Sequence, residues 1–251
     1  MHHTLSRFSI LVLVLLLLPS CTYASEVSIE KDTECSVLLL PTEDMGEEYL
    51  DSFIFFGEST TYHMKDREVL RDGKDTNQIW APDSGTVNLD LTTCTIPLLY
   101  PDTGEHLTLG EAAARKKPPY LVLTFGLNGA VQKVKRGEDY YKSCYRSLID
   151  CIQEASPDTR IILQSAFPVS DCMDVSRYSV TVWELNGCID RLNEWTRELS
   201  EEYGLRYLNT AEILKDERGF LMSSYQVGDG HHLTRDAYLE ILYYIRTHGY
   251  Q

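Results

Sequence analysis

Three short segments of the chain combine glycine with side chains that take part in acyl chemistry. They read Gly-Glu-Ser-Thr at 57–60, Gly-Leu-Asn-Gly at 126–129 and Gly-Asp-Gly-His-His-Leu-Thr at 228–234. Acyl transfer needs a hydroxyl nucleophile, an imidazole base, a carboxylate that orients the base, and donors for the developing oxyanion. A glycine turn with one serine is common by itself. Together the three segments supply all four groups.

The spacing in the third segment selects the base. One turn of backbone brings the Asp229 carboxylate beside the ring three residues later, which favours His232 over His231 as the oriented imidazole. An adjacent histidine pair also raises the alternative of a metal site. No further histidine or acidic cluster and no Cys-x-x-Cys motif supplies ligands, so we predict no metal. We expect His231 at a rim and His63 at the surface or in a pocket wall.

Apolar runs alternate with helical patterns along the chain, which is typical of βαβ units and a mostly parallel sheet. We predict strands at 53–56, 120–125, 160–163 (continuing to 167) and 205–208. Helical stripes occupy 141–152 and 185–199, the second ending at Gly204. Capping patterns at Thr108 with Glu111, and at Thr234, predict two further helices. Each chemical segment therefore follows a strand or precedes a helix, where open parallel sheets place their crevice.

The order of these motifs resembles the SGNH (GDSL-like) hydrolases: Gly-Glu-Ser near the start, Gly-x-Asn in the middle, and Asp-x-x-His-Leu before a C-terminal helix. The resemblance covers most of the chain after the N-terminal segment. It implies a three-layer α/β/α fold with a flavodoxin-like central sheet, and an enzyme without metal or organic cofactor. By matching motif it implies Ser59 as nucleophile, Asp229 and His232 completing a triad, and the Asn128 side chain as an oxyanion donor.

Two further donors are implied by the same resemblance. They are the Ser59 backbone amide and the amide of a glycine between the first two motifs. Gly85, in a polar turn, is the better candidate and Gly73 is its rival. Two positions depart from the family pattern: Glu58 stands where Asp is usual, and Gly129 where Asp often follows the asparagine. These departures leave the proposed catalytic atoms in place but weaken any transfer of substrate preference.

Ser165, after the third predicted strand, is the rival nucleophile. It lacks a preceding glycine turn and is followed by Ala-Phe-Pro, which is typical of a strand end, so Ser59 is preferred. Aromatic residues near the motifs are candidates to stack on a sugar or to line a pocket or core, namely Tyr62, Trp80 and Tyr225.

The N-terminus predicts export. Arg7 precedes an uncharged run over 8–18, which is shorter than the roughly 18 residues that span a bilayer comfortably. Residues 18–21, Leu-Pro-Ser-Cys, resemble a lipobox that would lipidate Cys21, and cleavage after Ala24 is the alternative. We therefore divide the chain into a signal segment at 1–21, a tether and lead-in at 22–50, and a hydrolase domain at 51–251. The expected location is extracellular, or the outer face of the cytoplasmic membrane through that anchor.

A formal net charge of −15 makes nucleic acid an improbable partner. Six cysteines remain besides Cys21, yet Cys144, Cys151 and Cys188 fall on apolar helical faces and are expected to pack in the core. The leading function is hydrolysis of a small O-acyl ester, an acetyl group on an extracellular carbohydrate being the favoured case. The alternatives are an O-acyltransferase that uses the same triad, and a surface binding protein on the same fold that has no turnover.

Overall fold

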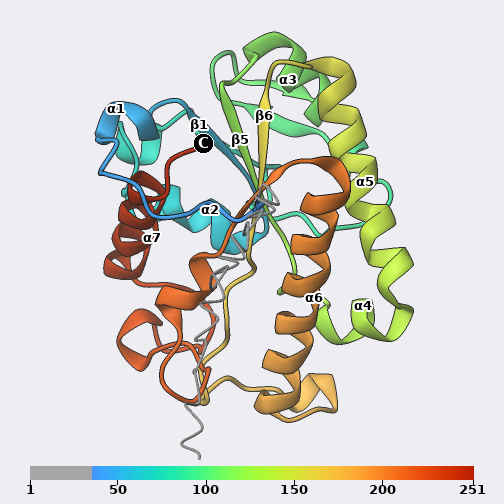
Figure 1. Ribbon diagram of the computed structural model, residues 1–251, viewed down its shortest axis with the longest axis vertical. Coiled ribbons are helices and arrows are strands. Elements are labelled where there is room, and N and C mark those ends of the chain that lie inside the picture. Colours follow the sequence, from blue (N-terminus) through green and yellow to red (C-terminus); the bar gives the residue numbers. More distant parts are fainter. Residues whose placement is uncertain (1–35) are drawn as a thin grey trace, which may run out of the picture. The chain divides into compact units, whose positions relative to one another are not determined.

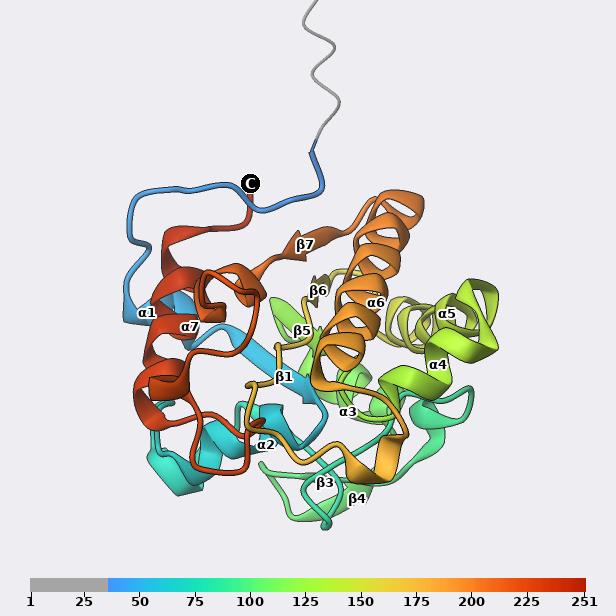
Figure 2. The ribbon, with the colours of Figure 1, turned by 90° about the horizontal axis from the view of Figure 1, so that it is seen from below.

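The computed structural model describes residues 36–251, and the predicted signal segment, Cys21 and residues 22–35 lie outside this range. A five-stranded parallel sheet in the order β2-β1-β5-β6-β7 forms the centre (Figures 1 and 2). Its strands are β1 (Phe53–Gly57), β2 (Ile79–Trp80), β5 (Tyr120–Thr124), β6 (Arg160–Gln164) and β7 (Arg206–Leu208). This is the flavodoxin-like strand order, so the predicted fold class is confirmed.

Helices cover both faces of the sheet (Figures 1 and 2). On one face lie α3 (Leu109–Lys116), α4 (Ala130–Arg136), α5 (Glu138–Ala155) and α6 (Val182–Tyr203); on the other lie α1 (Glu47–Leu50), α2 (Ser59–Asp66) and α7 (Arg235–Thr247). Each face buries its own apolar cluster, which explains why β1, β5 and β6 are apolar at nearly every position. Within the described residues, no helix is both long and apolar enough to cross a membrane.

The predicted helix ends are confirmed. Thr108 forms a capping box with Glu111 at the start of α3, and Thr234 accepts from the Ala237 amide at the start of α7. Gly204 ends α6 in the left-handed conformation, with φ +63°. The third strand is shorter than predicted, because β6 ends at Gln164 and the chain then leaves the sheet.

Smaller elements fill the connections. A hairpin of β3 (Leu98–Tyr100) and β4 (Glu105–Leu107) precedes α3. Short 3-10 helices occur at η1 (Gly73–Asp75), η2 (Thr93–Thr95), η3 (Ser176–Tyr178), η4 (Thr210–Leu214) and η5 (Ser223–Tyr225). Neither β2 nor the hairpin was predicted, since runs of two or three residues carry no clear periodicity.

Residues 36–50, which fall in the predicted tether and lead-in at 22–50, belong to the packed structure. The Leu39 amide donates to the Tyr207 carbonyl at 2.9 Å and the Tyr207 amide donates to Val37, so this segment lies along β7. The side chains of Asp44 and Glu47 pair with Arg246 of α7. The packed unit therefore begins well before residue 51.

The described cysteines are all free thiols. Cys144 is fully buried in the core, as expected, whereas Cys188 is half-buried against the same cluster and Cys151 is half-buried without belonging to it. The expectation of core packing is therefore met by Cys144, met in part by Cys188 and not met by Cys151.

Candidate active site

Ser59 lies at a sharp turn from β1 into α2. Gly57 ends the strand, Glu58 is the extended N-cap residue, and Ser59 is the first residue of the helix. A Cβ atom at Gly57 would lie 2.4 Å from both the Thr124 carbonyl oxygen and the Thr61 hydroxyl, so only glycine permits this close approach. The serine is thereby placed at the carboxyl edge of the sheet, where the amides and dipole of α2 favour negative charge.

The structure brings Ser59, His232 and Asp229 together. Ser59 Oγ lies 3.3 Å from His232 Nε2, and His232 Nδ1 lies 2.6 Å from Asp229 Oδ2. With its proton on Nδ1, the ring donates to the carboxylate and can accept the serine proton at Nε2. This connectivity is the one that nucleophilic acyl transfer requires.

The Asp229 carboxylate is held in its charged form. Burial by itself would raise its pKa, but the backbone amides of His232 and His231 donate to Oδ1 at 2.9 and 3.0 Å, and the His232 ring donates to Oδ2. These hydrogen bonds outweigh burial and lower the pKa of Asp229 below its ordinary value. The residue therefore remains an anion that can stabilise an imidazolium at His232.

The loop that carries Asp229 and His232 is fixed from two sides. The Gly230 carbonyl accepts from the Ser170 amide at 2.7 Å, and a Cβ at Gly230 would lie 2.6 Å from the Met173 Cα. From within the loop, the Gln226 side chain accepts the amides of Gly228 and Gly230. The packing of Gly230 against residues 170–173 thus sets the position of the triad loop.

Glu58 connects the serine turn to the second motif. Its side chain is only 2% exposed, and the carboxylate accepts three backbone amides, from Gly126 at 3.2 Å and from Leu127 and Asn128 at 3.0 Å each. Burial raises the pKa of Glu58, while the nearby Lys133 ammonium and the three amides oppose that rise. Glu58 therefore acts as a clamp that joins the turn at Ser59 to the loop at 126–128. The sequence motifs alone did not predict this role.

Asn128 is held at both backbone groups. Its amide donates to Glu58 and its carbonyl accepts from the buried Lys133 ammonium. Burial lowers the pKa of Lys133, and the Glu58 carboxylate counteracts this. No described residue hydrogen-bonds the Asn128 carboxamide, which leaves that group available to a ligand at the edge of the sheet.

The two candidate glycine donors have their amides engaged. The Gly85 amide donates to the Pro82 carbonyl at 2.8 Å, and the residue lies against the Tyr62 ring, where a Cβ would come within 2.9 Å. The Gly73 amide donates to the Leu70 carbonyl at 3.1 Å. Gly85 is therefore near α2, as the third donor requires, but its N–H is used inside its own turn.

Ser165 is excluded as the nucleophile by its surroundings. It is fully buried, and its hydroxyl accepts the Ala211 amide at 2.8 Å. The side chain thus satisfies a backbone donor next to β7 and has no access to solvent. Trp80 is likewise buried, at 1% exposure, so it packs in the core, whereas Tyr62 and Tyr225 are half-buried.

Two further histidines contact His232. The ring centroid of His63 lies 4.4 Å from that of His232, and the His231 centroid lies 3.9 Å away. Burial lowers the pKa of both neighbours, and the His232 ring lowers it further. His63 Nδ1 is buried with no partner among the described residues. His63 was predicted at the surface or in a pocket wall, and it is half-buried with its ring against His232.

Asp229, His231 and His232 place potential ligand atoms within 4.8 Å of one another. Both ring nitrogens of His232 are engaged, one with Ser59 and one with Asp229. This cluster is therefore arranged for proton transfer, and we assign it no metal.

The chain matches the family model described as GDSL-like Lipase/Acylhydrolase over residues 55–239, which includes all three motifs. The chain belongs to this family. It is accordingly a hydrolase-type enzyme that acts on acyl esters. No curated protein has a sequence that matches it significantly.

Solved structures show the same fold at low identity. A GDSL-like lipase from Bacteroides thetaiotaomicron has a TM-score of 0.51 and 15% identity, covering 80% of this chain and 88% of its own. A protein described as a platelet activating factor from Streptococcus pneumonia has a TM-score of 0.53 and 19% identity, covering 79% and 86%. At this identity the likeness supports the fold alone.

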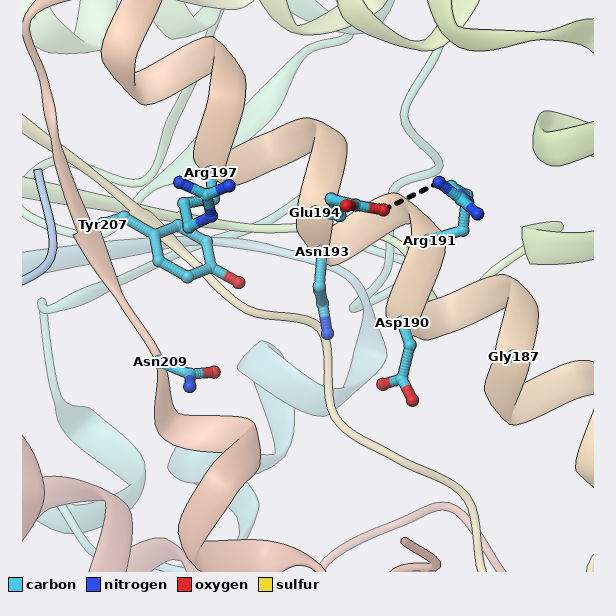
Figure 3. A pocket seen from close by; sticks show the side chains of 8 residues that line it. All are labelled: Gly187, Asp190, Arg191, Asn193, Glu194, Arg197, Tyr207 and Asn209. Atoms are coloured by element: carbon cyan, nitrogen blue, oxygen red, sulfur yellow. Dashed lines mark hydrogen bonds and ion pairs between the residues drawn. The ribbon is translucent and has the colours of Figure 1, made fainter.

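A cavity of about 420 Å³ in this GDSL-like enzyme lies between α6 and the segment that carries Tyr207 and Asn209 (Figure 3). Side chains of α6, among them Asp190 and Asn193, line one side, and Tyr207 and Asn209 line the other. None of the residues in the three motifs contributes to it. The candidate catalytic groups Ser59, His232 and Asp229 therefore lie outside this cavity.

Proposed function

We propose that the protein is a serine esterase that hydrolyses a small O-acyl ester, an O-acetyl group in the favoured case, on a carbohydrate. The observation that carries the proposal is the continuous contact from Ser59 through His232 to Asp229. The exported location expected from residues 1–21 supports an extracellular polymer as the source of the ester.

The proposed reaction has two halves. Ser59 Oγ attacks the acyl carbon while His232 Nε2 takes its proton, and the same proton then passes to the leaving alkoxide as the ester bond breaks. In the second half His232 deprotonates a water that attacks the acyl-enzyme, and the protonated ring returns the proton to Ser59 as the acid leaves. Asp229 remains an anion throughout and stabilises the imidazolium.

The oxyanion formed in both halves needs hydrogen-bond donors already in place. We assign this role to the Ser59 amide, at the N-terminus of α2, and to the Asn128 carboxamide. The Gly85 amide donates to the Pro82 carbonyl. It would become a third donor only if it gave up that hydrogen bond and donated to the oxyanion instead. The clamp formed by Glu58 fixes Asn128 relative to the serine.

Hydrolysis and acyl transfer share the acyl-enzyme and differ in the acceptor, water or a sugar hydroxyl. Product analysis with an acylated donor and a glycan acceptor separates them, since only a transferase forms acylated glycan faster than free acid.

Lipidation at Cys21 or release after Ala24 is decided by mass spectrometry of the mature N-terminus.

The test of the proposal is hydrolysis of p-nitrophenyl acetate by matched variants. Loss of a catalytic serine typically costs about 10⁶ in turnover. Ser59→Ala is therefore expected to be inactive, whereas folded Ser165→Ala is expected to keep turnover within a few-fold of the parent. An active Ser59→Ala enzyme would rule out the assignment. If the folded protein hydrolysed no ester and a fluorophosphonate probe did not label Ser59, the esterase assignment would also be wrong. The remaining alternative would then be a binding protein without turnover.

A further inference from the structure

A smaller cavity, of about 230 Å³, begins at Asn128 itself. It is lined by the loop at 88–90, by Asn128 and Gly129, by α4, and by Tyr140 of α5. Because its wall includes the candidate oxyanion residue, a molecule that fills this cavity contacts Asn128, although none of Ser59, Asp229 and His232 lines it. The 420 Å³ cavity between α6 and β7 has no such connection.

The lining of this cavity is polar. It includes the carboxamides of the exposed residues Asn88 and Gln132 and of the half-buried Asn128, and no described residue forms a hydrogen bond with any of the three. Each carboxamide offers two donors and an acceptor in one plane. Leu89 is its one aliphatic side chain. Most pockets for apolar ligands are lined predominantly by apolar side chains, so this one is not suited to a fatty acyl chain.

The charged groups around the cavity leave it without a strong excess of either sign. Lys133 is occupied by the Asn128 carbonyl and faces the Glu58 carboxylate. Arg136 lies over the Tyr140 ring, 3.3 Å from its centroid, and Asp90 accepts from Thr92. A neutral ligand with many hydroxyls suits such a site better than an anion.

Gly129 explains why the space is open. The residue has φ +70°, and a Cβ there would point at the Lys133 ammonium, 3.4 Å away. A longer side chain at this position would enter the cavity beside Asn128. The departure from the family pattern at residue 129 thus leaves room beside Asn128.

We propose that the cavity bounded by Asn88, Asn128 and Gln132 binds the alcohol part of the substrate, and that this part is a sugar ring with free hydroxyls. The proposal rests on the esterase function above. Vicinal hydroxyls would pair with the carboxamides, while the acyl group, held at Ser59, contributes little to recognition.

The experiment compares kcat/KM for a panel of mono-O-acetylated pyranosides with that for ethyl acetate, which has the same acyl group but no hydroxyls. Gln132→Leu and Asn88→Leu keep the side-chain size and remove the hydrogen bonds. Lys135→Leu is the matched control, because Lys135 is exposed on the same helix and does not line the cavity.

We expect the parent to prefer at least one pyranoside by about tenfold or more, which corresponds to one or two hydrogen bonds. Each cavity variant should lower that preference about tenfold and leave ethyl acetate hydrolysis unchanged, while Lys135→Leu changes neither. Equal rates on both substrates, or a preference that survives both variants, would overturn the sugar site but not the esterase. If no ester in the panel were hydrolysed in a Ser59-dependent manner, both the esterase function and the sugar site would be wrong.

Discussion

The Glu58 carboxylate accepts the Asn128 backbone amide at 3.0 Å, so the residue before the candidate nucleophile holds the residue that would bind the oxyanion. The same carboxylate also takes the amides of Gly126 and Leu127. A chain that carries its serine and its oxyanion donor after two separate strands needs such a link to fix their distance.

Glu58→Gln should lower kcat by about 10²- to 10³-fold, the usual cost of a lost oxyanion donor, with little change in KM. The carboxamide offers one acceptor oxygen and turns an NH₂ group toward backbone donors. The loop at 126–128 would therefore lose its position. Steady-state kinetics check this, with Glu111→Gln, at an exposed helix cap, as a control for general effects. A parent-like kcat in Glu58→Gln would show that the clamp has no role in turnover.

Asp229→Asn should reduce kcat by about 10⁴-fold while the protein stays folded. The amide cannot stabilise an imidazolium, and its NH₂ group favours the wrong tautomer of His232. The measurement is kcat on p-nitrophenyl acetate, with circular dichroism to verify folding. Activity within tenfold of the parent would mean that His232 is oriented by some other group.

Gly230→Ala should impair both activity and stability, because the new Cβ would collide with the Met173 backbone at 2.6 Å. Gly228→Ala is the matched control, since Gly228 also has a positive φ, at +112°, but open space around its Cβ position. Backbone strain alone costs about 1–3 kcal/mol. Urea unfolding and kcat should therefore show the larger loss for Gly230→Ala. Equal losses in the two variants would deny that contact with residues 170–173 positions the triad loop.

Because His63 and His231 are packed beside His232, we expect the folded protein to lose stability in acid. Burial holds the pKa of His63 and His231 below the 6.5 expected in the unfolded chain. The unfolded state then binds protons more readily, so stability falls as pH drops below about 6.5. Asp66, Arg67, Asp229 and His232 are the charged or titratable groups that face His63.

His63→Phe keeps the ring contact and removes one of these protonation sites. The decrease in Tm between about pH 7.5 and pH 5.5 should therefore be smaller in His63→Phe than in the parent. Differential scanning calorimetry at both pH values measures this. An identical decrease in the two proteins would assign the acid sensitivity to other groups.

The strands, the helix ends and the catalytic residues could be predicted from the sequence where the conformation depends on residues close together in the chain. Apolar runs bounded by glycine predicted β1 and β5, and the Asp-x-x-His spacing predicted which histidine lies beside Ser59. The Thr108 capping box and the Gly204 cap fixed two helix boundaries. In each case the conformation depends on neighbours within a few residues.

Features that depend on distant partners were missed. The role of Glu58 arises from amides some seventy positions later, and the contact of His63 with His232 joins α2 to the last loop. The alignment of residues 36–40 with β7 depends on one hydrogen-bonded edge. The engagement of the Gly85 amide with Pro82 is a property of turn geometry that the residue type alone does not specify.

The most direct measurement is site mapping after labelling with a fluorophosphonate, which reacts covalently with an activated serine. Peptide mass spectrometry should find a single adduct, on Ser59, and labelling should disappear in Ser59→Ala and slow strongly in Asp229→Asn. An adduct on any other serine, or an unlabelled Ser59 in the folded protein, would contradict the account.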